Sequence, residues 1–146
     1  MDSYERINNA LVNLFRDVLT LEERAMARSE FQDLSMNDWH VIEAIGAEGQ
    51  KSMSQVAKEL SVTHGTLTTS VNGLFSKGYV QRRRGTEDRR MVYVSLTEKG
   101  AAAFQEHAEF HREMVDSVIR DQTPQEIDVL AGSLSKLTDF FMSFKA

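Results

Sequence analysis

Arginines crowd around one short turn of an otherwise acidic chain. The sequence has 17 Lys and Arg against 22 Asp and Glu, yet residues 51–100 carry a net charge of +5 and the remainder carries −10. Guanidinium groups bind phosphate oxygens and fit the narrow minor groove of A·T-rich DNA. This segregation suggests an anion-binding module, the alternative being a solvated basic loop. The arginines of the turn are Arg82, Arg83, Arg84, Arg89 and Arg90.

Small hydrogen-bonding side chains recur at helical spacing just before this turn. On the expected helix 63–77, the apolar residues share one face and are predicted to pack inward: Leu67, Val71, Leu74 and Phe75. The opposite face carries Gly65, Thr66, Thr69, Asn72, Gly73 and Ser76. Thr and Asn can donate to or accept from base edges in the major groove. An amphipathic helix with a merely polar outer face is the competing interpretation.

Capping signals and periodicity predict the elements that position these residues. Ser35 with Asp38, and Ser52 with Gln55, have the spacing of capping boxes. Alternating residues on both sides of the arginine turn predict a β-hairpin. The predicted order is α-α-α-α-β-β-α-α, a mainly α fold with a small β-hairpin wing beside a helix-turn-helix. The expected helices are 4–28, 35–45, 53–60, 63–77, 97–120 and 123–144, and the expected strands are 79–83 and 91–96.

A signature in the hairpin resembles that of the MarR family of winged helix-turn-helix regulators. It consists of Asp88, Arg90, Val94, Leu96, Thr97 and Gly100 at the spacing found here, and segments 54–60 and 62–66 fit the two reading helices of that family. The resemblance covers the whole chain. It implies a homodimer whose recognition helices enter successive major grooves of a palindrome, with the wings in the flanking minor grooves.

The same resemblance implies which residues meet DNA. Arg90 matches the wing contact and Asp88 its support, and Thr69 stands where many members carry Arg, so one guanine contact is expected to be missing. The full set of expected DNA-binding residues is Thr63, His64, Gly65, Thr66, Thr69, Asn72, Arg82, Arg84, Asp88, Arg89 and Arg90.

The long helices are predicted to pair two chains. Residues 1–146 are expected to form one domain, with 35–98 as the DNA-binding part and 1–30 and 99–146 as dimerisation helices. The last helix has an apolar seam at heptad spacing, which favours pairing with another long helix over packing within the chain. This seam consists of Ile127, Leu130, Leu134, Leu137, Phe141 and Phe144.

Four polar residues interrupt the apolar helix seams. They are Glu22, His40, His107 and His111. Buried polar groups need partners, so the first interpretation is that these residues form a hydrogen-bonded network. Three imidazoles and a carboxylate can also hold zinc, and the four positions resemble the zinc site of a zinc-responsive member of the family. A third interpretation places them around a small organic effector.

One branch of the family supplies a more specific resemblance. Segments 62–74, 77–80 and 88–90, with Phe110 and His111, resemble repressors of fatty-acid-synthesis genes. The resemblance implies that a long-chain acyl group on acyl carrier protein acts as corepressor. Such a chain needs an apolar site, although apolar stripes are usually core. The candidate lining residues are Phe15, Val18, Leu19, Met26, Trp39, Phe104 and Met114.

Other function classes find little support in the sequence. There is no cysteine and no phosphate-binding glycine loop or hydrolase motif, so we expect no enzyme and no certain cofactor. No apolar run approaches the ~18 residues of a membrane span, and the first residues do not resemble a signal peptide. A cytoplasmic DNA-binding regulator is therefore expected, and a protein–protein adaptor is the rival.

Overall fold

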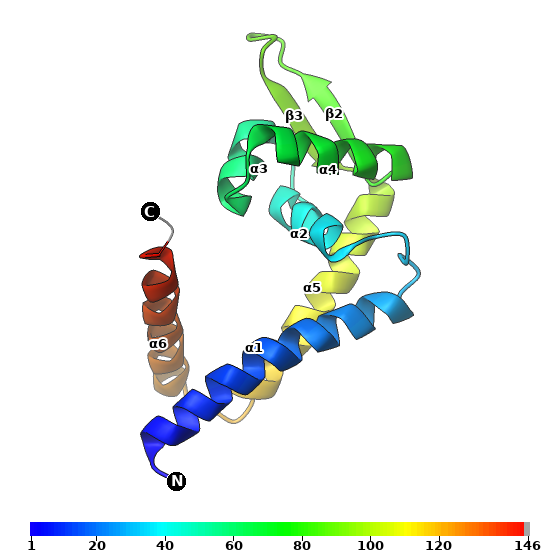
Figure 1. Cartoon of the computed structure of the whole chain (residues 1–146). Coiled ribbons are helices and arrows are strands. Elements are labelled where there is room, and N and C mark those ends of the chain that lie inside the picture. The colour runs from blue at the N-terminus through cyan, green and yellow to red at the C-terminus, as the bar shows by residue number, and fades with distance from the viewer. Residues whose placement is uncertain (145–146) are drawn as a thin grey trace. The chain divides into compact units, whose positions relative to one another are not determined.

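The structure is mainly helical and has one small antiparallel sheet, as the sequence predicts. The computed structural model describes residues 1–144 and divides into two compact units, Met1–Phe110 and the residues from His111 onward. Figure 1 labels the elements along the chain. They are α1 (Ser3–Arg28), α2 (Met36–Ile45), β1 (Lys51–Ser52), α3 (Met53–Leu60), α4 (His64–Lys77), β2 (Val80–Arg84), β3 (Val92–Leu96), α5 (Glu98–Ile119) and α6 (Pro124–Met142).

Polar caps begin the helices at the predicted residues. Ser35 accepts a hydrogen bond from the Asp38 N–H, and the Asp38 carboxylate accepts one from the Ser35 N–H. Ser52 and Gln55 make the same reciprocal pair at the start of α3. Each box satisfies N–H groups that the first helical turn leaves without partners. These short-range signals fix where α2 and α3 begin.

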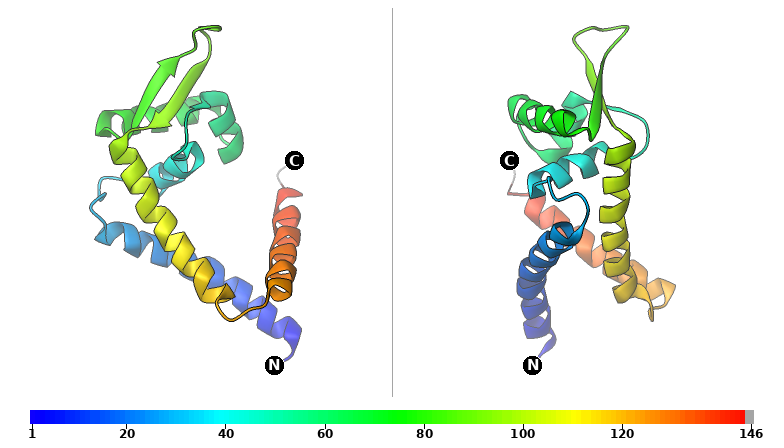
Figure 2. Two further views of the ribbon diagram at one scale, coloured as in Figure 1. Left: turned by 180° about the vertical axis from the view of Figure 1, so that it is seen from behind. Right: turned by 90° about the vertical axis from the view of Figure 1, so that its right-hand side faces the viewer.

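The sheet has three antiparallel strands in the order β1-β3-β2. β2 and β3 form the predicted hairpin, in which Arg82 lies opposite Val94. The predicted order lacks β1, whose Lys51 also pairs with Val94. A strand of two residues is too short to show alternation of apolar and polar residues in the sequence, so only the structure reveals its pairing. Figure 2 shows the hairpin beside α4, with its tip extending beyond the helices.

A buried apolar core holds α4 against the sheet. Leu67, Val71 and Leu74 of α4 are almost completely buried, as predicted. They join side chains from α2, α3, β2 and β3, including Ile42, Ile45, Val56, Val80 and Val94. Gly78 ends α4 in the left-handed conformation, at φ +87°. Because one face of α4 is buried and its C-terminal end is fixed, the opposite face of the helix is exposed in a defined orientation.

The two units also expose apolar side chains on long helices. α1 exposes Ile7, Leu14 and Leu19 in the first unit. In the second unit α6 has no buried residue in the part of the chain that is described, and Leu134 is 52% exposed. Exposed apolar stretches of this kind mark interaction surfaces. Within residues 1–144, no helix is both long and apolar enough to cross a membrane.

Candidate nucleic-acid interface

The outer face of α4 is exposed, as the sequence predicts. Thr66, Thr69 and Asn72 are open to solvent, together with His64, Gly65, Gly73 and Ser76. The Thr69 hydroxyl donates to the Gly65 carbonyl at 3.2 Å, which leaves its oxygen lone pairs available as acceptors. No acidic side chain stands on α4 to repel phosphate. This face can therefore approach a polyanion and offer both donors and acceptors.

Thr63 acts as the helix cap. Its hydroxyl oxygen accepts from the Thr66 N–H at 3.1 Å, and the hydroxyl lies 2.8 Å from that of Thr66. The main role of the Thr63 side chain in this structure is therefore to cap the N-terminus of α4. Its exposure keeps it at the edge of the predicted interface.

Phe75 departs from the prediction. The sequence pattern places it inward with Leu74, yet 48% of its surface is exposed. The Arg82 guanidinium from β2 lies over its ring, with Cζ 4.5 Å from the ring centroid. The prediction was wrong because helical periodicity cannot show that a neighbouring strand brings a cation to this face. The Arg82 Nη1 also donates to Asn72 Oδ1, so wing and helix are joined here.

At the wing tip, Arg90 and Asp88 form the predicted pair. Arg90 Nε lies 3.1 Å from Asp88 Oδ1, and Arg90 Nη2 lies 3.2 Å from Oδ2. The Arg90 N–H also donates to Oδ1 at 3.0 Å. The hydrogen bonds from the Arg90 side chain, then that from its N–H, lower the pKa of Asp88. The Arg90 side chain remains 92% exposed, so the carboxylate holds a guanidinium that faces solvent.

The other wing arginines divide between two directions. Arg84 and Arg89 are exposed near the tip, as expected for residues that meet DNA. Arg83 follows Arg82 along β2, so its side chain points to the opposite face of the sheet. Its Nε donates to Gln50 Oε1 at 3.2 Å, and its guanidinium lies over the Tyr93 ring.

A polar network that the sequence analysis missed anchors the end of α4. The Lys77 ammonium donates to the Asp33 carbonyl at 2.6 Å and to Asp38 Oδ2 at 3.1 Å. The buried Tyr79 hydroxyl donates to Asp33 Oδ1 at 2.5 Å. This bond lowers the pKa of Asp33, whereas burial, followed by the bond itself, raises the pKa of Tyr79. The partners are 39 to 46 residues apart in sequence, beyond the reach of spacing rules.

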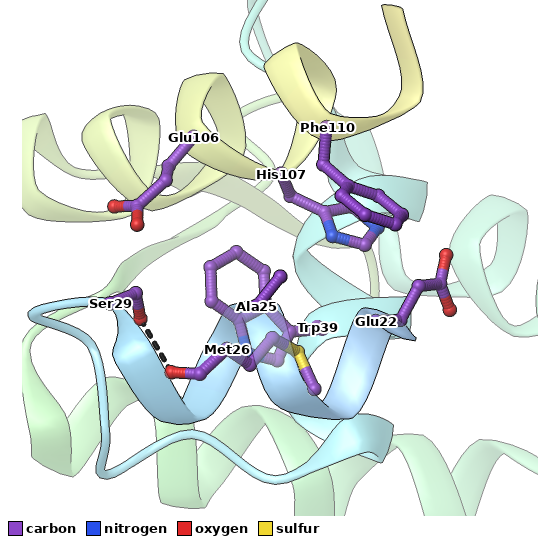
Figure 3. A pocket seen from close by; sticks show the side chains of 8 residues that line it. All are labelled: Glu22, Ala25, Met26, Ser29, Trp39, Glu106, His107 and Phe110. Carbon is purple, nitrogen blue, oxygen red and sulfur yellow. Dashed lines mark hydrogen bonds between the residues drawn. The ribbon is translucent and has the colours of Figure 1, made fainter. Parts of the chain in front are cut away.

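A cavity of about 40 Å³ lies among α1, α2 and α5 in the first unit. Figure 3 shows side chains of α5 facing α1, with Trp39 behind them. The His107 ring lies 5.2 Å from the Trp39 ring, and its Nε2 lies 3.4 Å from Glu43 Oε2. Trp39 Nε1 is buried without a hydrogen-bond partner among the described residues. The lining residues are Glu22, Ala25, Met26, Ser29, Trp39, Glu106, His107 and Phe110.

The structure brings together only part of the predicted Glu/His cluster in this unit. Glu22 is buried, His107 is half-buried, and each offers a ligand atom within 4.8 Å of the other's. His40 is exposed on α2 and does not line the cavity. The prediction that His40 is buried was wrong for the single chain. The residues on either side of it in sequence are buried, whereas the His40 side chain lies on the exposed side of α2. His111 follows His107 by one helical turn and belongs to the second unit.

The predicted effector residues are also divided. Met26 and Trp39 line the cavity, and Phe104 packs against the same core. Phe15 and Leu19 are exposed on α1 and lie outside the cavity lining, as does the half-buried Val18. Met114 is half-buried in the second unit. The observed cavity is far smaller than the roughly 300–1,000 Å³ of typical ligand sites.

The chain is similar to several known DNA-binding proteins. Residues 28–107 match the family model of the transcriptional regulator SarA/Rot. FabT of Streptococcus pneumoniae, solved in complex with DNA, is 41% identical, with a TM-score of 0.86, over 97% of this chain and 99% of that one. A mutant MarR from Escherichia coli complexed with operator DNA is 27% identical, with a TM-score of 0.61, over 94% and 99% of the two chains.

A Bacillus subtilis HTH-type transcriptional repressor, YetL, is 31% identical over 64% of this chain and 56% of its own length. These likenesses agree with the observed order of helices and strands. Because the likeness to FabT extends through the reading helix, the wing and nearly the full length of both chains, this protein belongs to the MarR family of winged helix-turn-helix transcriptional regulators.

Proposed function

We propose that this chain is a homodimeric repressor of fatty-acid-synthesis genes, which binds palindromic DNA more tightly when long-chain acyl-acyl carrier protein is present. The observation that carries the proposal is the 41% identity over 97% of the chain to a FabT bound to DNA. The segments that resemble fatty-acid-synthesis repressors include the reading helix and the wing, so the likeness includes the residues that would select the operator.

The exposed face of α4 would read bases while the wing holds the backbone or minor groove. Thr66, Thr69 and Asn72 offer uncharged donors and acceptors of the kind that read base edges. Arg90 is held by Asp88 yet exposed, which suits insertion into a narrow minor groove. In this arrangement the helix contacts bases and sets the sequence specificity, whereas the wing contacts phosphates and adds affinity for any sequence.

A homodimer accounts for the exposed apolar faces. Ile7 and Leu14 on α1, and Leu134 and Phe140 on α6, are each at least half exposed in the single chain. Burial of such side chains stabilises by roughly 25 cal/mol per Å². A two-fold dimer would place equivalent α4 helices on half-sites about 10 bp apart.

The corepressor would act through a conformational equilibrium. A cavity of about 40 Å³ holds little more than one or two water molecules. An acyl chain therefore needs a more open arrangement of the helices around Met26 and Trp39. If that arrangement also reads DNA better, ligand and DNA each tighten the binding of the other by the same factor.

The direct test is a titration of DNA by the full chain after treatment with chelator. The DNA is a palindrome from a fatty-acid-synthesis promoter, and a scrambled duplex is the control. Long-chain acyl-acyl carrier protein is expected to tighten binding to the palindrome at least fivefold, within the usual 5- to 150-fold range of coupling. Unacylated carrier protein is expected to have no effect. An identical affinity with both carriers would contradict the proposed corepressor.

A zinc-responsive repressor is the second candidate, favoured by the closeness of Glu22 and His107. Their ligand atoms lie within 4.8 Å of one another beside the cavity. Protein purified without chelator is then expected to hold nearly one zinc per chain, and His107→Ala is expected to lose it. If neither zinc nor the acylated carrier changes DNA affinity, another small organic effector becomes the candidate.

A further inference from the structure

The backbone of the wing tip is closed by hydrogen bonds within the loop itself. Residues 85–91 connect β2 to β3, at the end of the hairpin that extends beyond the helices (Figure 2). The Gly85 N–H donates to the Met91 carbonyl at 2.7 Å, and the Met91 N–H donates to the Asp88 carbonyl at 3.1 Å. The loop therefore folds back on itself instead of extending freely from the two strands.

Asp88 holds both the turn and the arginine that follows it. Its backbone carbonyl accepts from the Met91 N–H, while its carboxylate accepts from the N–H and the guanidinium of Arg90. The backbone and the side chain of one residue are thus used together. Where the Asp88 backbone lies therefore decides where the Arg90 guanidinium points.

Gly85 provides the space that the Asp88 backbone occupies. It is buried, although Arg84 and Thr86 on either side of it are exposed. A Cβ on Gly85 would lie 2.4 Å from the Asp88 carbonyl oxygen and 3.2 Å from the Met91 Cβ. The first distance is well inside the roughly 3.3–3.6 Å of a close carbon–oxygen contact, so any side chain here would push the Asp88 backbone away.

Close approach, and not an unusual backbone conformation, explains the glycine. Gly85 is not among the glycines with positive φ, so its backbone conformation is open to other residues. A substitution would therefore act through the lost space. This distinguishes Gly85 from Gly78, which ends α4 at φ +87° with nothing near its Cβ position.

We propose that Gly85 is a positioning residue for DNA binding, which lets the Asp88 carbonyl close the wing tip and so holds Arg90 in the orientation that meets DNA. The inference rests on the proposed function, in which Arg90 is the wing contact. Ordering a loop on binding costs conformational entropy and lowers affinity, and a tip that is already closed avoids this cost. Gly85 acts on DNA only through Asp88 and Arg90.

A double-mutant cycle on the full-length protein tests this route. Wild type, G85A, R90A and the double variant are titrated by anisotropy with the palindrome of the proposed function, with either A·T or G·C pairs at the flanks that the wings would meet. T86A is the matched control, because it changes the adjacent exposed residue and leaves the space between Gly85 and Asp88 unaltered. Thermal unfolding checks that each variant is folded.

G85A is expected to weaken binding by about three- to tenfold and by no more than R90A does, as for the loss of a hydrogen-bonded arrangement. In the R90A background G85A is expected to change affinity by less than about twofold, because the two residues act through one contact. Wild type and T86A should bind more weakly when the flanks are G·C, whereas G85A and R90A should respond less to this change.

Hydrogen exchange tests the closed tip without DNA. In free wild type the Met91 N–H is expected to exchange roughly tenfold or more slowly than in an unstructured chain, because it is bonded to the Asp88 carbonyl. In G85A the same N–H should lose this protection. The wild-type measurement tests the loop geometry even if G85A is poorly folded.

Three results would overturn the inference. An unprotected Met91 N–H in wild type would mean that the tip is open. Wild-type affinity in G85A, or an equal loss with and without Arg90, would mean that Gly85 does not act through Arg90. If wild type binds the palindrome no better than a scrambled duplex, the proposed function itself fails and the inference fails with it, whatever the exchange rates are.

Discussion

At the residue scale, the carboxylate of Asp88 is a negative charge placed where a DNA-binding surface is expected to be positive. Its hydrogen bonds to the Arg90 guanidinium explain this placement. Simple electrostatics predicts that removing the charge strengthens DNA binding. If Asp88 positions Arg90, its removal instead weakens binding.

Asp88→Asn is therefore expected to lower DNA affinity by about two- to fivefold, as for the loss of an exposed ion pair. Arg90→Ala is expected to cost roughly tenfold and to reduce the slope of log affinity against log salt by about one. Fluorescence anisotropy at several salt concentrations measures both. Tighter binding by Asp88→Asn would show that Asp88 does not support the wing contact.

Tyr79 and Asp33 give the fold a defined response to pH. The pKa of Asp33 is lowered by the hydrogen bond from Tyr79, so its share of the stability is present above its ordinary pKa of 3.8 and is lost as pH falls below that value. The pKa of Tyr79 is raised, chiefly by burial. Its share is therefore complete below pH 10 and is lost as pH rises above it.

Tyr79→Phe is expected to lower the free energy of unfolding by about 1–2 kcal/mol at neutral pH, because it removes a hydrogen bond to a charged group. The variant is also expected to lose less stability than wild type above pH 10, since it has no hydroxyl to ionise. Urea unfolding between pH 3 and 11 tests both points. Parallel pH curves for the two proteins would contradict the role of this bond.

At the element scale, the start of α5 is packed tightly against the end of α4 and the sheet. Thr97 accepts a hydrogen bond from the Gly100 N–H and donates to the Gly78 carbonyl, so its side chain caps the start of α5. A Cβ on Gly100 would lie 2.0 Å from the Tyr79 carbonyl oxygen. Only glycine allows this approach, so the glycine of the hairpin signature has a packing role.

Gly100→Ala is accordingly expected to destabilise the protein by about 3 kcal/mol, because rigid backbone has to move. Gly73→Ala is the control within a helix, since a Cβ there meets nothing within 4 Å. It is expected to stabilise the free protein by about 0.5–1 kcal/mol. Thermal unfolding distinguishes the two, and equal effects would mean that the contact at Tyr79 relaxes easily.

Elements with local signals were predictable from the sequence. Ser35 and Ser52 begin helices through side chains three residues apart, and Gly78 ends one through its own conformation. β1 was not predictable, because its two residues become a strand only by pairing with β3. The same limit applies to the site, where Arg82 and Asn72 meet through the packing of a strand on a helix.

At the scale of the whole molecule, the proposed dimer would cover apolar side chains that one chain leaves exposed. Leu134 is 52% exposed on α6 and belongs to the predicted heptad seam. Leu134→Glu is expected to shift the protein toward monomer and to weaken binding to the full palindrome at least tenfold, while a single half-site is bound as before.

Ser135→Glu introduces the same charge at the adjacent exposed residue and is expected to leave the dimer intact. Sedimentation equilibrium gives the association state, and anisotropy gives the two affinities. A dimer that survives Leu134→Glu would place the interface elsewhere and contradict the seam.

The strand order also determines when the DNA-reading unit becomes complete during synthesis. β1 emerges from the ribosome before α3 and α4, but its partner β3 ends only at Leu96, 19 residues after the last residue of α4. At a synthesis rate of roughly 5–20 residues per second, about 1–4 seconds pass between the synthesis of the last residue of α4 and that of the last residue of β3. During that interval the hairpin is incomplete, and a nascent chain truncated before Arg82 would present Asn72 without the arginine that restrains it.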